Sequence, residues 1–489
     1  MILSILVWVY LLQILDKTIL GYSAIFGLRE DNRLTGNQYS IVGSIAPVAQ
    51  LLWQPFSSIL IVKVPHRILM PSLVLGWGIA QALTPTCHSF LGLLTNRFFL
   101  GIFEAGCLPL FSIITGQWYR RSEQPVRVAA WYGTNGLATI IAALLAYGLG
   151  SIKSPILAPW QMLVSSILIR SRDATDKVDF RIFLSTGLVT IASVPIIYWK
   201  LDNDISSARF LTREERAQAM ERLRANQTGA GSSELKWSQV REAFLDHKTY
   251  LFLGMSLANN LGAQVTNTFG PIILSGFGFD KFKTTLLNIP FGAIQYLVIL
   301  AVAWASIKLR WKSLALITIL IPILAGLILL YVLPRDSNST KALLLGYYLL
   351  AFIFGGNTLI VSWILANTAG QTKKSVMMSL YNAASSTGNI IGPLLFDAAD
   401  APAYLPGLRS TLAAFCIMVV LVLLQVGEVF RLNNAQARRR VAHGKPAQIH
   451  DHSMEGEYVD IAAGNEETIG EQAFADMTDR ENDEFIFVY

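Results

Sequence analysis

Residues 89–121 read SFLGLLTNRFFLGIFEAGCLPLFSIITGQWYRR, and this stretch decides the fold class. Between residues 89 and 117 it carries only two charged side chains, Arg97 and Glu104. A helix that crosses a bilayer needs about 20 predominantly apolar residues. The stretch is therefore long enough to span a membrane, and its two charges lie where a charge is costly.

The composition of the whole chain agrees with a membrane protein. Hydrophobic residues make up 53% of the 489 residues, and charged residues make up only 15%. Soluble globular proteins carry about 25% charged residues. This balance excludes a nucleic-acid-binding protein, a disordered chain and a soluble enzyme.

The chain shows no sign of catalytic or metal chemistry. It contains no P-loop, GxSxG or HExxH pattern, and its three cysteines, Cys87, Cys107 and Cys416, are scattered through apolar segments. An odd, dispersed set of cysteines is neither a disulfide framework nor a metal site. We therefore expect no enzyme activity, no metal and no cofactor.

Apolar stretches of spanning length recur twelve times. We expect transmembrane helices at 2–27, 38–62, 68–86, 89–117, 127–150, 181–199, 249–276, 283–305, 313–333, 341–366, 373–396 and 409–431. This pattern predicts an all-α membrane protein with twelve transmembrane helices in two pseudo-symmetric six-helix bundles.

Polar segments divide the chain into four parts. We expect an N-terminal bundle at 1–199, a central cytoplasmic loop at 200–248, a C-terminal bundle at 249–431 and a cytoplasmic tail at 432–489. Residues 162–180 form an anomalous insertion with six charges and no clear period. This insertion is either a real extracellular segment or non-native sequence from a gene-model error.

Positive charges predict the orientation in the membrane. Basic residues gather in alternate short loops and at the start of the tail: Lys63, Arg67, Arg120, Arg121, Arg127, Lys308, Arg310, Lys312, Lys373, Lys374, Arg438, Arg439 and Arg440. Short loops rich in Lys and Arg stay on the cytoplasmic side. We expect that side to hold both termini as well.

Four ionisable residues lie within the first-half helices: Asp16, Lys17, Arg97 and Glu104. Each charge at mid-membrane costs about 2.5–3.5 kcal/mol on insertion scales. We therefore expect the four to pair and to line an aqueous cavity. The alternative is an ion pair that only fixes helix packing.

Their chemistry suggests separate roles. A carboxylate that gains and loses a proton is the natural coupling group, and we expect Glu104 first and Asp16 second in that role. An anionic substrate needs a fixed cation, and Arg97 and Lys17 are the candidates.

Amides and aromatic residues take the place of charges in the second half. Asn260, Gln264 and Asn267 lie at i, i+4 and i+7, on one helix face. With them we expect three further substrate-binding side chains: Asn357, Tyr381 and Asn382. The alternative is that these amides only hydrogen-bond helices to one another.

Several segments together resemble the anion:cation symporter family of the major facilitator superfamily. Residues 96–132 look like that family's helix 4–5 signature. The other segments are LDKTILGYSAIFGLREDNRLTGNQYSIVGSI (15–45), FLTREERAQAMERLRANQTG (210–229), W-x-Q-x-x-E-A-F-x-D (237–246) and DMTDRENDEF (476–485). The fungal allantoate permease-like branch is the most similar in these motifs.

The resemblance implies alternating access between two six-helix halves, with substrate bound near the middle of the membrane. It also implies that Asp16, Lys17, Arg97 and Glu104 carry coupling and anion binding, because related sugar-acid transporters hold matching residues there. Lys17 departs from the arginine of those relatives. The loop IVKVPHRILMP (61–71) keeps only the basic character of the superfamily's pattern.

From these features we expect a fungal plasma-membrane symporter that takes up a small organic anion with protons. The substrate would be allantoate, another ureido acid or a similar carboxylate, and the alternatives are nicotinate, pantothenate or another vitamin. A non-transporting sensor or an inactive pseudo-transporter is the alternative from another class. The expected partners are the substrate, protons and the lipid bilayer, with no nucleic acid, and we expect a monomer.

Overall fold

A computed structural model gives the arrangement of the chain. It describes residues 1–26, 32, 34–35, 38–150, 178–226, 234–275, 281–309, 311–336, 338–396, 400, 403–449 and 475–489. Within these ranges the regular secondary structure is helical. The expected insertion at 162–180 lies outside the described residues, except for its last three, which begin a helix.

The first half holds all six of its predicted spans. Its helices are α1 (Ile2–Phe26), α3 (Gln38–Lys63), α4 (His66–Leu83), α5 (Phe90–Glu104), α6 (Cys107–Trp118), α7 (Gln124–Tyr132), α8 (Thr134–Gly150) and α10 (Val178–Lys200). Two of the spans are interrupted, so that α5 and α6 form one and α7 and α8 form another.

The second half also holds six spans. Its helices are α13 (His247–Ser275), α14 (Lys281–Leu309), α15 (Lys312–Val332), α16 (Thr340–Leu349), α17 (Ile353–Ala366), α18 (Gln371–Leu394) and α19 (Leu405–Ala442). A short 3₁₀ turn joins α16 to α17 within one span. The helix predicted to end at 431 continues to Ala442.

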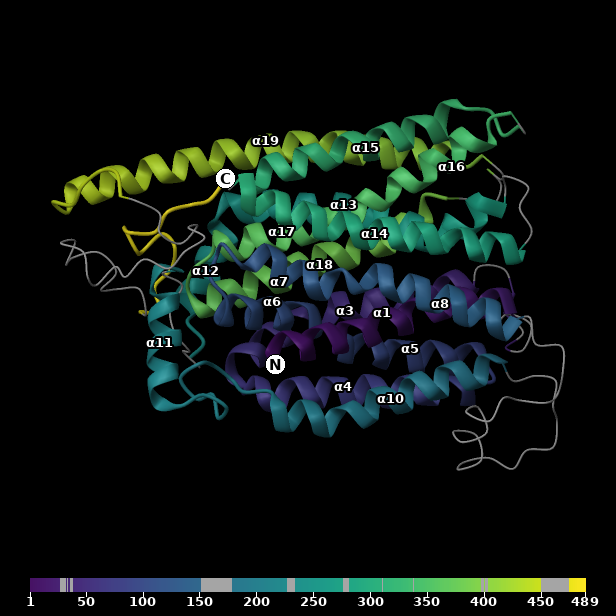
Figure 1. Cartoon of the computed structure of the whole chain (residues 1–489), viewed down its shortest axis with the longest axis horizontal. Coiled ribbons are helices and arrows are strands. Elements are labelled where there is room, and N and C mark those ends of the chain that lie inside the picture. The colour runs from purple at the N-terminus through teal and green to yellow at the C-terminus, as the bar shows by residue number, and fades with distance from the viewer. Residues whose placement is uncertain are drawn as a thin grey trace.

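Two short helices, α11 (Arg213–Leu223) and α12 (Trp237–Leu245), connect the halves. Thr212 and Glu215 cap α11 reciprocally, each side chain bonding the other's backbone N–H. In Figure 1 the long helices run side by side, and α11 lies across one end of them.

The surface of the bundle suits a bilayer. Large apolar side chains are exposed along its flanks, including Leu52, Leu91 and Ile321. Among the described residues, nine helices are long and apolar enough to cross a membrane. Amide-rich α13 and α18 belong to the remaining spans.

The two halves meet along two helix pairs, α3 with α18 and α8 with α14. At the second contact the backbones nearly touch, because a Cβ added to Gly136 would lie 2.4 Å from the carbonyl oxygen of Gly292. Glycine is therefore required at this crossing.

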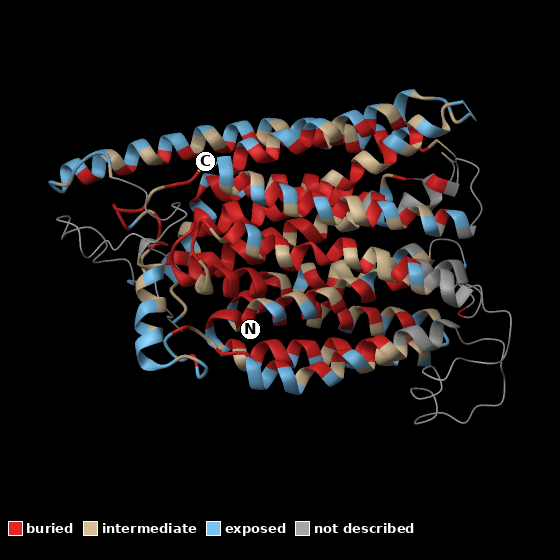
Figure 2. Ribbon diagram, in the orientation of Figure 1, coloured by how far each residue is buried: buried red, intermediate tan, exposed pale blue. Residues whose placement is uncertain are grey.

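We call the end of the bundle that holds α11, α12 and the basic short loops the basic end. Every residue from 353 to 379 is buried there, whereas α18 becomes partly exposed beyond residue 380. Figure 2 shows the same concentration of buried residues near α12. Burial along α17 and α18 is thus most complete towards the basic end.

Candidate functional site

The structure brings Lys17 and Glu104 into direct contact. The ammonium nitrogen of Lys17 on α1 lies 3.2 Å from Glu104 Oε2 on α5. The amide of Gln50 on α3 donates a hydrogen bond to the same oxygen at 2.9 Å. Among the described residues, no group donates to the second carboxylate oxygen of Glu104, Oε1, which is also buried.

Asp16 faces another helix. Its Oδ2 accepts a 2.6 Å hydrogen bond from the indole nitrogen of Trp77 on α4. Consecutive residues of a helix point about 100° apart, so Asp16 and Lys17 cannot face the same neighbour. Asp16 thus holds α1 against α4, while Lys17 reaches towards α5.

Arg97 lies two turns before Glu104 on α5, and its side chain is buried. Electrostatic interactions connect its guanidinium to Glu104 and Asp16. The four predicted residues therefore form one cluster of two basic and two acidic side chains.

The cluster lies beside the junction of the two halves. Gln50, which binds Glu104, also accepts a 3.4 Å hydrogen bond from Ser386 on α18. The Lys17 side chain is 43% exposed, whereas Glu104 is fully buried. Lys17 is therefore the more exposed charged group of the Lys17–Glu104 pair.

A second polar cluster forms in the other half. Asn260 on α13 and Asn357 on α17 exchange two hydrogen bonds, each of 3.1 Å. The Tyr381 hydroxyl on α18 donates to Asn357 Oδ1 at 2.7 Å. Tyr132 of the first half is also hydrogen-bonded to Asn357, so this cluster too reaches the junction.

Asn382 connects the halves through a backbone carbonyl. Its amide donates to the carbonyl oxygen of Ala105 at 3.0 Å, and Gln54 donates to the same oxygen at 3.1 Å. In a continuous helix this carbonyl would bind the N–H of residue 109, but Pro109 has none. The interruption between α5 and α6 thus supplies a backbone acceptor for side chains at the junction.

The remaining two predicted amides are placed differently. Asn267 is exposed, away from the Asn260–Asn357 pair. The side chain of Gln264 lies outside the described part of the structure. The i, i+4, i+7 spacing identified a helix face, but its C-terminal end does not join this cluster.

Sequence reasoning missed several side chains of the two clusters: Gln50, Gln54, Trp77, Tyr132 and Ser386. Gln50 and Gln54 are four residues apart in an apolar helix, and this spacing is a signal that could have found them. Trp77 carried no such signal, because a tryptophan in an apolar helix is ordinary.

Metal binding finds no support in the part of the chain that the structure describes. Within those ranges, no group of three or more His, Cys, Asp or Glu side chains is placed to hold a metal ion.

Comparison with known proteins identifies the family. The model for the Major Facilitator Superfamily matches residues 6–393. The chain belongs to the major facilitator superfamily. It is a multi-pass membrane transporter with that superfamily's fold of two six-helix halves.

Two curated relatives of this superfamily come from Saccharomyces cerevisiae. A thiamine pathway transporter is 30% identical, with 100% of this chain and 84% of the relative covered. An allantoate permease is also 30% identical, with 97% of this chain and 82% of the permease covered.

Solved structures share the fold at lower identity. A human organic anion transporter superposes with a TM-score of 0.54 at 16% identity, covering 87% of this chain and 98% of its own. A bacterial homologue of a human lysosomal transporter, captured inward-facing and occupied, gives a TM-score of 0.56 at 16% identity. It covers 87% of this chain and 96% of its own.

Proposed function

We propose that this transporter carries a small organic anion together with protons by alternating access. The observation that supports this most directly is the Lys17–Glu104 contact of 3.2 Å beside the junction of the halves. One member of the pair is open to a solute, and the other is a buried carboxylate. A substrate carboxylate can therefore compete with Glu104 for the same ammonium group.

That competition couples binding of the substrate to protonation of Glu104. When an anion binds Lys17, Glu104 loses the cation that balances its buried charge. An unpaired carboxylate in a low-dielectric site is costly, and taking up a proton removes that charge. Oε1 of Glu104, to which no described group donates, is the oxygen that would hold the proton.

Arg97 and Asp16 support the same cycle. Arg97 adds a fixed positive charge two turns before Glu104 on α5, which attracts an anion and helps to balance Glu104 when the carboxylate is ionised. Asp16, held by Trp77, is the second candidate for a proton. Their opposite charges keep the empty cluster neutral overall.

The second half would recognise the rest of the substrate. Asn260, Asn357 and Tyr381 carry donors and acceptors that now satisfy one another. A ligand with amide or ureido groups can exchange with these partners, and Asn382 offers a further amide. Gln264 and Asn267 remain proposed contacts that require a different arrangement of α13.

This chemistry favours allantoate, another ureido acid or a similar carboxylate as the substrate, in line with the allantoate permease among its relatives. Nicotinate and pantothenate share the carboxylate. Thiamine, suggested by the name of another relative, is a cation and would have to bind Glu104 and Asp16 instead.

The charge pattern supports an orientation in which the basic end, with both termini, lies in the cytoplasm. We also propose that the transporter is a monomer in the plasma membrane. The halves would be residues 1–199 and 249–431, joined by a cytoplasmic loop at 200–248 and followed by a cytoplasmic tail at 432–489.

Uptake measurements test the proposal. Labelled allantoate, nicotinate, pantothenate and thiamine are offered to a transport-deficient yeast that expresses the chain, at pH 5 and pH 7, with and without an uncoupler. Uptake of an anion that is faster at pH 5 and abolished by the uncoupler is expected. Uptake that the uncoupler does not reduce would refute proton coupling. If none of the compounds is taken up, the sensor or inactive alternative is favoured.

One substitution locates the proton site. Glu104→Gln keeps the hydrogen-bonding shape but cannot ionise, so accumulation should be lost while exchange of substrate across the membrane persists. Glu214→Gln, on the exposed face of α11, is the matched control and should accumulate substrate normally. Accumulation by the Glu104→Gln variant would show that protons are carried elsewhere.

A further inference from the structure

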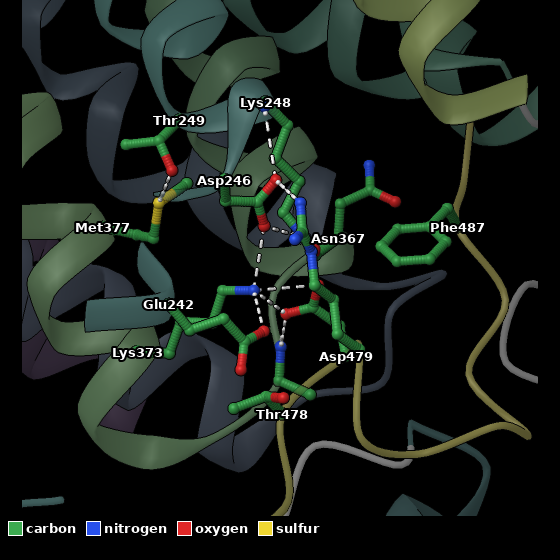
Figure 3. A network of polar contacts seen from close by, with 12 residues as sticks. Glu242, Asp246, Lys248, Thr249, Asn367, Lys373, Met377, Thr478, Asp479 and Phe487 are labelled. Carbon is green, nitrogen blue, oxygen red and sulfur yellow. Dashed lines mark hydrogen bonds and ion pairs between the residues drawn. The ribbon is translucent and has the colours of Figure 1, made fainter. Parts of the chain in front are cut away.

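The last residues of the chain, 475–489, pack against the basic end; we call them the terminal segment. Asp479 within it forms ion pairs with Lys248 of α13 and Lys373 of α18, the second at 2.9 Å. Both lysine side chains are fully buried. Figure 3 shows these groups converging on one another. The terminal segment thus supplies a counter-ion that the second half needs.

A further carboxylate completes this network. Asp246, between α12 and α13, lies 2.9 Å from the Lys373 ammonium and 3.3 Å from that of Lys248. Burial raises the pKa of both Asp246 and Asp479, but the neighbouring lysines outweigh burial and hold both pKa values below their usual range. Both carboxylates therefore stay ionised at neutral pH.

Backbone contacts anchor the end of the terminal segment. Asn367 accepts from the N–H of Val488 at 2.7 Å and donates to its carbonyl at 2.9 Å, and Trp363 donates to that carbonyl at 2.8 Å. Phe485 and Phe487 are buried with apolar residues of α19. These contacts all belong to the second half, so the terminal segment moves with that half.

In the described part of the chain, Arg121 of the first half reaches the terminal segment. Arg121, in the loop between α6 and α7, donates to the carbonyl oxygen of Ile486 at 3.2 Å. Its guanidinium also lies over the Phe485 ring, 4.2 Å from the centroid. Its backbone N–H binds Asn226 Oδ1 at 3.0 Å, away from the second half.

This contact lies close to the junction of the halves at the basic end. Ser375 of α18 donates to the carbonyl oxygen of Ser58 of α3 at 3.0 Å. A Cβ added to Gly116 of α6 would lie 3.6 Å from Leu365 of α17. Opening the basic end must separate all of these pairs.

We propose that the terminal segment is a latch on the basic end. It is fixed to the second half and holds Arg121 of the first half through Phe485 and Ile486. The basic end opens only after Arg121 leaves this contact. The proposal rests on alternating access, but it requires neither the substrate nor the coupling ion to be as proposed above.

Chemical labelling tests the latch. Ser375→Cys places a thiol at the buried junction, and its rate of modification by a maleimide in inside-out vesicles measures how often the basic end opens. Arg121→Gln should raise that rate about tenfold, the equivalent of one lost hydrogen bond to a charged group. Arg127→Gln is the matched control, because Arg127 contacts Tyr119 within its own half, and it should leave the rate unchanged.

A native thiol distinguishes opening from unfolding. Cys107 is buried inside the first half and should stay unmodified in the same samples, as read by mass spectrometry. If the Ser375→Cys thiol reacts equally fast with and without the Arg121→Gln substitution, the latch is refuted. A parallel rise at Cys107 would equally refute it, since general loosening then explains the result.

A second variant keeps the proposal testable if the Arg121→Gln protein does not fold. Phe485→Leu keeps an apolar side chain but removes the ring beneath the guanidinium, and it leaves the Asp479 network in place. It should raise Ser375→Cys labelling in the same direction, and an unchanged rate would overturn the proposal. The assay needs no substrate or proton gradient, so its outcome is independent of the uptake tests.

Discussion

Asp479→Asn removes one charge from a buried network, and its effect can be worked out from the contacts. Removing one partner of a buried ion pair costs about 3–5 kcal/mol, because the other charge is left uncompensated. Lys373 keeps Glu242 at 2.8 Å and Asp246 at 2.9 Å, so the lower figure applies. A loss of about 3 kcal/mol raises the undocked fraction of the terminal segment on the order of 100-fold.

Amide hydrogen exchange of a peptide covering 475–489 measures that fraction. The matched control is Asp476→Asn, three residues earlier. Asp476 pairs with Lys236, whose side chain is 38% exposed, and asparagine retains the acceptor for the Gln371 N–H. Such a screened pair contributes about 0–1 kcal/mol, so exchange should rise less than about fivefold. Equal exchange in the two variants would refute the reasoning.

Three more expectations concern other parts of the molecule. Trp77→Phe removes one donor to Asp16, a hydrogen bond worth about 1.5–3 kcal/mol if the carboxylate is ionised, and should lower uptake and thermal stability together; unchanged values would mean that its other partner, Thr186, holds Asp16 instead. Gly136→Ala places a methyl group 2.4 Å from the backbone of α14 and should block surface expression or uptake, and normal uptake would contradict this. In a His443→Gln background, which removes the imidazole 2.7 Å from Asp483, docking of the terminal segment should not depend on pH between 5 and 7.5. The pKa values of Asp246 and Asp479 are lowered, so the stability that they contribute is complete above about 4 and is lost only as pH falls through the lowered values. Hydrogen exchange corrected for intrinsic rates checks this, and protection that falls between pH 7.5 and 5 would contradict it.

The twelve spans could be predicted because crossing a bilayer imposes a long apolar stretch that is visible in any sequence. The interruptions inside three of those spans were not predicted. One of them has a readable cause, since Pro109 cannot donate to the carbonyl of Ala105. The ends were harder, and the last helix continues eleven residues beyond 431, to Ala442.

The sequence predicted which residues form the charged cluster, but not which of them pair with one another. The cost of a charge within the membrane shows that the charges of Asp16, Lys17, Arg97 and Glu104 must be balanced by partners. The rotation of α1 about its own axis decides which of these side chains come into contact. That rotation depends on how α1 packs against α7, α8 and α10, whereas Trp77 of α4 reaches it only through a side chain. Helix spacing likewise placed Asn260 on a face without showing that Asn357 lies opposite.

The terminal segment was predicted only as part of a polar tail. Its acidic residues suggested solvent exposure, yet Asp479 is buried between lysines that come from distant helices. The four consecutive apolar residues from Phe485 to Val488 were the available signal for packing. Long-range charge complementarity of this kind cannot be read from local patterns.

The carbonyl oxygen of Ala105 would keep a hydrogen-bond donor if the two halves separated. It accepts from Gln54 of its own half and from Asn382 of the opposite half, so separation removes only one of its two donors. If the halves separate as proposed, the oxygen keeps its hydrogen bond from Gln54, and the Asn382 amide is left to bind water or a solute. Pro109 thereby provides, in the middle of the protein, a hydrogen bond between the halves that can be broken and formed again.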